Sequence, residues 1–396
     1  MSTVISYTLK QCTRCNKCLK QCPTSALTVK DERIVIESKR CINCGACLDA
    51  CVHQGMQAKG STLADLENYD YTVALIPTAV FGDCETPAEA ATLTAAIGKL
   101  GFDEVVELSS YDGALMNALE EVLASDTGSG PLIWGFCPVV HAWIKETYPA
   151  LLDRVIPFVP VSELAAADVR KRLKAKYENI GIFHLCECVS KLAMAKYPYG
   201  GKRQWQVDHA LSLTDLFPQI SRLQNKCEAN LSLCRKGLTQ AGMNLFLSEF
   251  PQYDCTGADG LVKVQRALET MEFGQLKKSR FVYLSNCLGG CVGGNLLWGN
   301  PFDKQVKIRD LCRMTHGQSA QIEASELFEE PVYEKSPPVS MAQRLKEVAE
   351  INAQLEQLPG YDCGACGYPT CRSLAEDILK NKSSLDKCRL RRRRSA

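Results

Sequence analysis

Apolar and polar residues alternate along the middle of the chain in a way that predicts strands and helices in turn. Short runs rich in β-branched residues, such as 71–77 and 180–185, are typical of strands. Helical stretches lie between such runs, as at 89–100. Two further short strands are expected at 132–134 and 280–284. This alternation predicts an α/β fold for the large middle region.

Three cysteines lie just beyond the ends of expected strands: Cys137, Cys188 and Cys287. Because ligands in α/β folds sit at the carboxyl ends of strands, we expect three strands to bring these thiols to one buried site. Pro138 suits the first position of a helix, where free amides favour an anionic cluster. Four glycines within 289–294 permit close packing against a bulky inorganic group, although alone they also fit an ordinary turn.

The bulk composition is that of a globular chain, with 46% apolar residues, 23% charged residues and a net charge of +1. The 396 residues suggest two or three domains. No run predicts a membrane span, no signal peptide opens the chain, and the balanced charge argues against nucleic-acid binding. The 22 cysteines therefore indicate a cytoplasmic iron–sulfur protein rather than a disulfide scaffold.

Two cysteine runs with identical spacing open the chain, and the first ends in Cys22-Pro23. Such runs are the sequence form of a two-cluster ferredoxin, in which the fourth cysteine of each run ligates the other cluster. A hairpin is expected between them, at 27–36. Zinc is the alternative metal. The predicted ligand sets are Cys12, Cys15, Cys18 and Cys51 for one [4Fe-4S] cluster, and Cys41, Cys44, Cys47 and Cys22 for the other.

The C-terminal region contains four more closely placed cysteines. Residues 331–339 are a linker by composition, and a helix is expected at 341–357 with Leu345, Val348 and Leu355 on one face. The tail from residue 389 is basic. Such a run is either a solvated end or a docking segment for an acidic partner. The glycine-rich loop resembles a small 4Fe-4S domain of redox complexes, with zinc as the competitor, and its predicted ligands are Cys363, Cys366, Cys371 and Cys388.

Three sequence frames resemble the cysteine loops of FeFe-hydrogenases: 136–138, 188–191 and 287–294. Further segments resemble that family at 76–80, 100–103, 148–152 and 256–257. With the ferredoxin repeat, the likeness covers nearly residues 1–320. It implies a two-lobed catalytic domain at 65–330, an N-terminal two-cluster ferredoxin-like α+β domain at 1–60 and a C-terminal 4Fe-4S domain at 341–396.

The resemblance also implies a cofactor and its ligands. A further [4Fe-4S] cluster, or cube, would be bound by Cys137, Cys188, Cys287 and Cys291. Together with the two N-terminal clusters and the C-terminal one, the chain would hold four [4Fe-4S] clusters. Cys291 would bridge that cube to a two-iron unit with CO and cyanide ligands. Lys191 would donate a hydrogen bond to one cyanide, and the backbone of Pro77 and Thr78 would seat the second. Judged without the family, Lys191 is equally well a solvent-facing helix lysine.

Several positions depart from the family pattern. Phe136 replaces a proton-relaying cysteine, Met194 replaces a relay glutamate and Ser285 replaces a methionine. Such changes resemble the slow, sensory branch of the family. Cys186 is either a small buried hydrophobe or an alternative proton donor. The cysteines without assigned partners are expected to be structural or incidental: Cys84, Cys227, Cys234, Cys255 and Cys312.

The expected function is reversible hydrogen oxidation and proton reduction at low turnover, in hydrogen or redox sensing. The expected partners are H2, protons and a redox protein such as ferredoxin or a signalling protein. One alternative is a non-catalytic electron carrier or cluster-assembly factor that lacks the two-iron unit. Another is a signalling subunit that reports redox state without turnover.

Overall fold

The computed structural model describes residues 3–128, 130–197, 204–224, 231–329 and 341–390. The chain divides into two compact units, one of Met1–Ala58 with Tyr333–Ala396 and the other of Lys59–Val332. The first and last of the three expected domains therefore fall in the same unit. Cys227, the linker at 331–339 and the tail from 391 onward lie outside the described residues.

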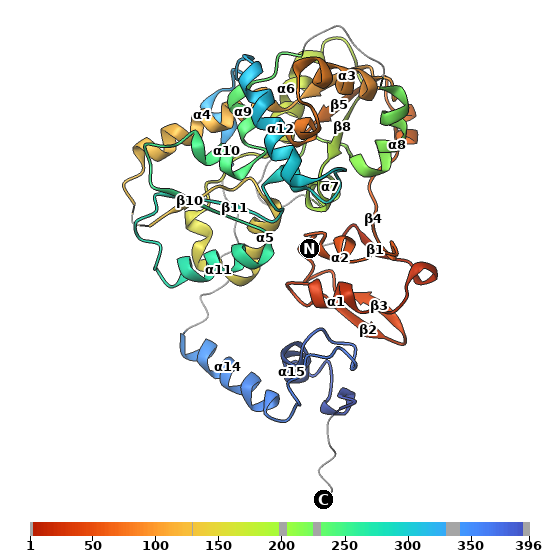
Figure 1. Ribbon diagram of the computed structural model, residues 1–396, viewed down its shortest axis with the longest axis vertical. Helices are drawn as coiled ribbons and strands as arrows, with labels where there is room; N and C mark the ends of the chain where they lie inside the picture. Colours follow the sequence, from red (N-terminus) through yellow and green to blue (C-terminus); the bar gives the residue numbers. More distant parts are fainter. Residues whose placement is uncertain (1–2, 129, 198–203, 225–230, 330–340, 391–396) are drawn as a thin grey trace, which may run out of the picture. The chain divides into compact units, whose positions relative to one another are not determined.

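Two parallel sheets form the centre of the larger unit (Figure 1). The prediction of an α/β fold is confirmed. One sheet has the strand order β6-β5-β8-β9 and lies beside α3 and α8, while the other has the order β10-β11-β7 and lies beside α10 and α11. The strands are β5 Tyr71–Ile76, β6 Glu104–Glu107, β7 Leu132–Ile133, β8 Ile180–Cys186, β9 His209–Ser212, β10 Cys255–Asp259 and β11 Phe281–Ser285.

Helices cover both sheets, and every residue of β8 and β11 is buried. The helix expected at 89–100 begins earlier, at Pro87, because the Thr86 hydroxyl accepts a hydrogen bond from the Glu89 amide and caps the helix there. The helices are α3 Pro87–Gly98, α4 Ser109–Ser125, α5 Pro138–Thr147, α6 Val161–Leu173, α7 Val189–Lys196, α8 Leu213–Leu223, α9 Arg235–Thr239, α10 Met243–Ser248, α11 Leu261–Glu272, α12 Pro301–Met314 and α13 Ala324–Leu327.

The N-terminal part of the smaller unit is built from short elements. β1 (Ile5–Tyr7) pairs with β4 (Met56–Ala58) and so joins the two ends of this part. β2 (Leu27–Lys30) and β3 (Arg33–Ile36) form the expected antiparallel hairpin. Each cysteine run carries one short helix, α1 Lys17–Gln21 and α2 Ala46–Asp49.

The C-terminal part contains α14 (Met341–Leu355) and α15 (Cys371–Leu379). The predicted apolar face of α14 is wrong in part, because Leu345 and Val348 are exposed. Ile351 is buried instead and packs, with Leu355 and Leu358 behind it, against the second helix. Ile351 and Leu355 are one helical turn apart, so the packed face belongs to the last turns of α14, and Leu358 follows beyond the end of the helix. Among the described residues, no helix combines the length and apolar character of a bilayer span.

Candidate metal centres and the pocket at Lys191

The first predicted ligand set surrounds a common pocket. Cys12, Cys15, Cys18 and Cys51 all line it, so the last cysteine of the second run does lie with the first run. Burial raises the pKa of Cys18 to about 11, and the thiols of Cys51 and Cys12 add to the increase. The Gly55 amide donates to Cys51 Sγ at 3.2 Å. Such N–H donors stabilise a thiolate and tune a cluster.

The second predicted set is more buried. Burial raises the pKa of Cys44 to about 12, with further increases from Cys22 and Cys41. Burial also raises the pKa of Cys47, and the neighbouring thiols of this set add to it. The Ala26 amide donates to Cys22 Sγ at 3.2 Å. Cys22 therefore lies with the second run, as the crossed ligation pattern predicts.

The C-terminal set also lines one pocket, which contains Cys363, Cys366, Cys371 and Cys388. The pKa of Cys366 is raised by burial and by the thiols of Cys388 and Cys363. Cys371 is the first residue of α15, where free backbone amides favour negative charge. No three His, Cys, Asp or Glu side chains in the described ranges are grouped as they would be around a single metal ion.

The four distant cysteines of the larger unit lie together at the ends of three strands. Cys137 and Cys188 each precede a helix, α5 and α7, while Cys287 follows β11 and Cys291 begins a short 3-10 helix. Burial raises the pKa of all four thiols, to about 12 for Cys188. Each thiol of the set interacts electrostatically with others of the set. The expected convergence of three strand ends on one buried site is therefore what the fold produces.

Close backbone contact explains the glycines between these cysteines. A Cβ on Gly294 would lie 2.3 Å from the carbonyl oxygen of Glu187, beside Cys188. Gly290 has a φ of 105°, and its Cβ would meet the Ala241 carbonyl oxygen at 2.7 Å. Larger residues would push the cysteine loop away from its neighbours, so these glycines hold the ligand loops together.

Lys191 is largely but not fully buried, with 14% of its side chain exposed, and it forms an ion pair that the sequence did not reveal. Its Nζ donates to Glu187 Oε1 at 2.5 Å, and the Glu187 side chain is 1% exposed. Burial opposes charge on both groups, yet their mutual attraction raises the pKa of Lys191 and lowers that of Glu187. Lys191 thus lies inside the protein as a cation, and the reading as a solvent-facing lysine is wrong. Glu187 was missed because Glu next to a cysteine has no distinctive spacing.

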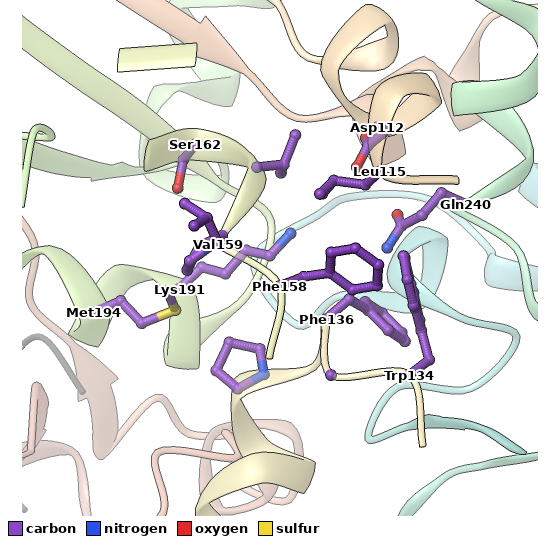
Figure 2. Close-up of a pocket in the computed structure, with 14 residues that line it drawn as sticks. Asp112, Leu115, Trp134, Phe136, Phe158, Val159, Ser162, Lys191, Met194 and Gln240 are labelled. Atoms are coloured by element: carbon purple, nitrogen blue, oxygen red, sulfur yellow. The ribbon is translucent and has the colours of Figure 1, made fainter. Parts of the chain in front are cut away.

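A small pocket of about 40 Å³ adjoins Lys191 (Figure 2). Phe136 and Met194 both line it, and Lys191 extends into it. The walls are otherwise mostly apolar, apart from Asp112, Gln240 and Ser162. The pocket therefore joins one buried cation to apolar walls and a single carboxyl group.

Asp112, on α4, is the second titratable residue of this lining. Its carboxylate accepts a hydrogen bond from the Thr78 hydroxyl. Burial raises the pKa of Asp112 to about 7, although Thr78 and the charge of Lys191 pull it down. A carboxyl group with this pKa gains and loses a proton near neutral pH. No pattern in the sequence points to Asp112, because a lone Asp in a helix is ordinarily exposed.

The remaining predicted site residues lie around the pocket rather than in its lining. Ser285 donates from its hydroxyl to the Cys287 carbonyl oxygen at 3.0 Å. Cys186 is fully buried, with Sγ 3.5 Å from His184 Nδ1, and burial raises its pKa well above the usual value. Pro77 caps the 3-10 helix that Thr78 begins. Of the spare cysteines, Cys255 is half-buried, and three are buried in the core: Cys84, Cys234 and Cys312.

Family models match three segments of the chain. Residues 4–52 match a 4Fe-4S dicluster domain, and residues 358–390 match an Fe-S cluster family. Residues 72–236 match the C-terminal domain of the iron-only hydrogenase large subunit. The two outer segments are thus similar to iron–sulfur cluster domains, and the middle segment is similar to an iron-only hydrogenase large subunit. This last match includes Cys137, Cys188 and Lys191, and ends before Cys287 and Cys291.

Solved structures of [FeFe]-hydrogenases are similar to this chain at low identity. A single-residue variant of [FeFe]-hydrogenase HydA1 from Chlamydomonas reinhardtii has 16% identity and a TM-score of 0.48, and the match covers 68% of this chain and 97% of that one. HydA(deltaEFG), from a study of stepwise H-cluster assembly, matches with 16% identity, a TM-score of 0.47 and the same coverage. No curated protein matches the chain.

Proposed function

We propose that this hydrogenase-like protein binds a cube and a two-iron unit in its larger unit and catalyses reversible hydrogen oxidation at low turnover. The observation that carries the proposal is the largely buried Lys191, which enters a pocket in the domain where four distant thiols converge. A buried cation without a function would cost stability, and a surface lysine would have sufficed for solubility. Slow turnover suits a hydrogen or redox sensor.

The residues present fit such a cofactor. The four convergent thiols, Cys137, Cys188, Cys287 and Cys291, would hold the cube, and Cys291 would also bind the two-iron unit. Burial disfavours free thiolates there, whereas bound iron would stabilise them. The two-iron unit would supply the metal at which hydrogen is activated. The Lys191 ammonium group has three N–H donors. One donates a hydrogen bond to Glu187, and the others remain for a small anionic ligand.

Proton handling in the pocket is assigned to Asp112 rather than Cys186. The Cys186 thiol is held at His184 away from the pocket lining, and its raised pKa makes it a poor acid. Asp112 lines the pocket and has a pKa near the working range of a general acid or base. Phe136 and Met194 carry no proton. A single carboxyl group in a lining that also contains Phe136 and Met194 would exchange protons slowly.

Infrared spectroscopy after maturation with the two-iron cofactor tests this function. Carbonyl and cyanide bands, together with hydrogen–deuterium exchange of H2, are the expected result. If the bands are absent while the cubes are present, the protein is instead an electron carrier or assembly factor. Iron analysis gives an independent check, with about eighteen irons per chain expected from four cubes and one two-iron unit. Stoichiometric zinc would contradict the cluster assignment.

A further inference from the structure

In the smaller unit, the ferredoxin-like part and the C-terminal part are joined by hydrogen bonds. The Val29 amide, on β2, donates to the Gly367 carbonyl oxygen at 2.8 Å. β2 pairs with β3 along one edge, so the C-terminal loop occupies its other edge. Gly367 has a φ of 86°, and a Cβ there would lie 2.6 Å from the Val29 carbonyl oxygen. The contact therefore needs a glycine, and that glycine directly follows Cys366.

Charged side chains bind the same two segments together. Arg40, next to Cys41, donates from Nε to the Thr24 carbonyl oxygen at 3.1 Å, and its guanidinium lies 3.5 Å from Asp377 and 3.7 Å from Glu376. The Asp377 side chain is only 8% exposed. A partly buried carboxylate is stabilised by such partners, and Arg40 supplies one from the ferredoxin-like side in addition to Tyr368 of the C-terminal domain.

A second ion pair adds to the contact. Lys382 Nζ lies 2.8 Å from Glu37 Oε1, and its hydrogen bond lowers the pKa of Glu37. Exposed pairs of this kind contribute little stability by themselves. They do fix how the C-terminal domain is oriented on the ferredoxin-like domain, because they lie at a different point of the contact from the Val29 backbone hydrogen bond. The ligand loops of the two cysteine-rich parts are thus held in one arrangement.

We propose that the C-terminal four-cysteine domain and the ferredoxin-like domain form one electron-transfer unit, joined at Val29–Gly367 and at Arg40. This inference rests on the cluster assignments and not on hydrogen chemistry. Within this unit, a cube held by the four C-terminal cysteines would accept one electron from a reduced one-electron carrier protein and pass it to an oxidised cube of the ferredoxin-like domain, with no bond formed or broken. Cys363 is exposed, as is Cys15, so the C-terminal ligand set is open to a carrier.

Electron paramagnetic resonance of the reduced full-length chain tests the junction. The spectrum of the parent should differ from the sum of two other spectra. One is the spectrum of an isolated cube, and the other is the spectrum of a Cys366→Ala variant that lacks the C-terminal cube. Arg40→Glu, which places like charges beside Glu376 and Asp377, should bring the spectrum to that sum. Lys39→Glu makes the same charge change one residue away, on an exposed side chain, and should leave the coupling unchanged.

Hydrogen exchange provides a readout that needs no cluster signal. The peptide containing Val29 should be protected in the full-length chain and should lose protection in Arg40→Glu. Val29→Pro, which removes the donor but no cysteine, should abolish the coupling with unchanged iron content. Rapid exchange at Val29 in the parent, or coupling that persists in both variants, would overturn the proposal. Neither readout uses carbonyl bands or turnover, so the junction and the hydrogenase function can fail separately.

Discussion

The cysteine sets of the two units differ in how the chain brings them together. In the N-terminal part, three thiols of each set come from one short run, and Cys15 is exposed. In the larger unit, four thiols come from three distant segments, and Cys137 and its partners are enclosed by strand ends and glycine loops. An exposed ligand such as Cys15 suits electron exchange with a partner. A set assembled from distant segments creates a site whose chemistry depends on its neighbours, here Lys191, Glu187 and Asp112.

Cys291→Ala is the change expected to separate the two kinds of site most completely. It removes the proposed bridge, so the carbonyl and cyanide bands should vanish. The clusters of the smaller unit should remain, because their ligands lie in other segments. Infrared spectra and iron analysis of the same sample measure both. Unchanged bands in the variant would show that Cys291 is not the bridge.

Restoring the missing relay tests whether the pocket limits the rate. Phe136→Cys with Met194→Glu should raise hydrogen evolution by about 10²-fold or more, because a positioned acid or base contributes about 10²–10⁴-fold. The double variant should exceed either single one, since a relay with one missing link remains broken. Intact cluster spectra are the control, because Cys at position 136 leaves a cavity beside Tyr283. An unchanged rate would direct attention to electron delivery or to Ser285.

Asp112→Asn should change how stability depends on pH. Because its folded pKa, about 7, exceeds the unfolded value, the folded state retains a proton that unfolding releases. The free energy of unfolding should therefore fall by about 4 kcal/mol between about pH 4 and pH 7, and Asn should remove this slope. The four tryptophans all belong to the larger unit and report its unfolding by fluorescence. Glu121→Gln, an exposed acid on the same helix, should retain the slope, and a slope in Asp112→Asn like that of the parent would contradict the assignment.

The smallest expected effect compares two positions on α14. Ile351→Ala should destabilise the C-terminal domain by about 2–4 kcal/mol, because it leaves a cavity between α14 and α15. Leu345→Ala should change stability by less than about 0.5 kcal/mol, because Leu345 is exposed. Denaturation followed through the absorbance of the C-terminal cluster measures both. Equal effects would mean that the helix packs through the face first expected from the sequence.

The sequence alone predicted much of the fold, for reasons that are local. The strands β5, β8 and β11 were visible because buried parallel strands are short apolar runs. The crossed pairing of Cys51 and Cys22 was also predictable, because the spacing of each run lets one loop present three sulfurs and leaves the fourth for the neighbouring cluster. The apolar face of α14 was less predictable, because Leu345 and Ile351 are both apolar and the sequence does not show which of them is buried.

Tertiary structure decided the chemistry of the pocket. Glu187 and Asp112 are ordinary acids in the sequence, and their charge states follow from burial and from the partners that folding gives them, Lys191 and Thr78. Folding also decides the contact within the smaller unit, where Gly367 meets a strand edge more than three hundred residues away in the chain. Spacing within one loop fixes which thiols can share a cluster. Electrostatic energy depends on distance through space, and only the fold sets that distance.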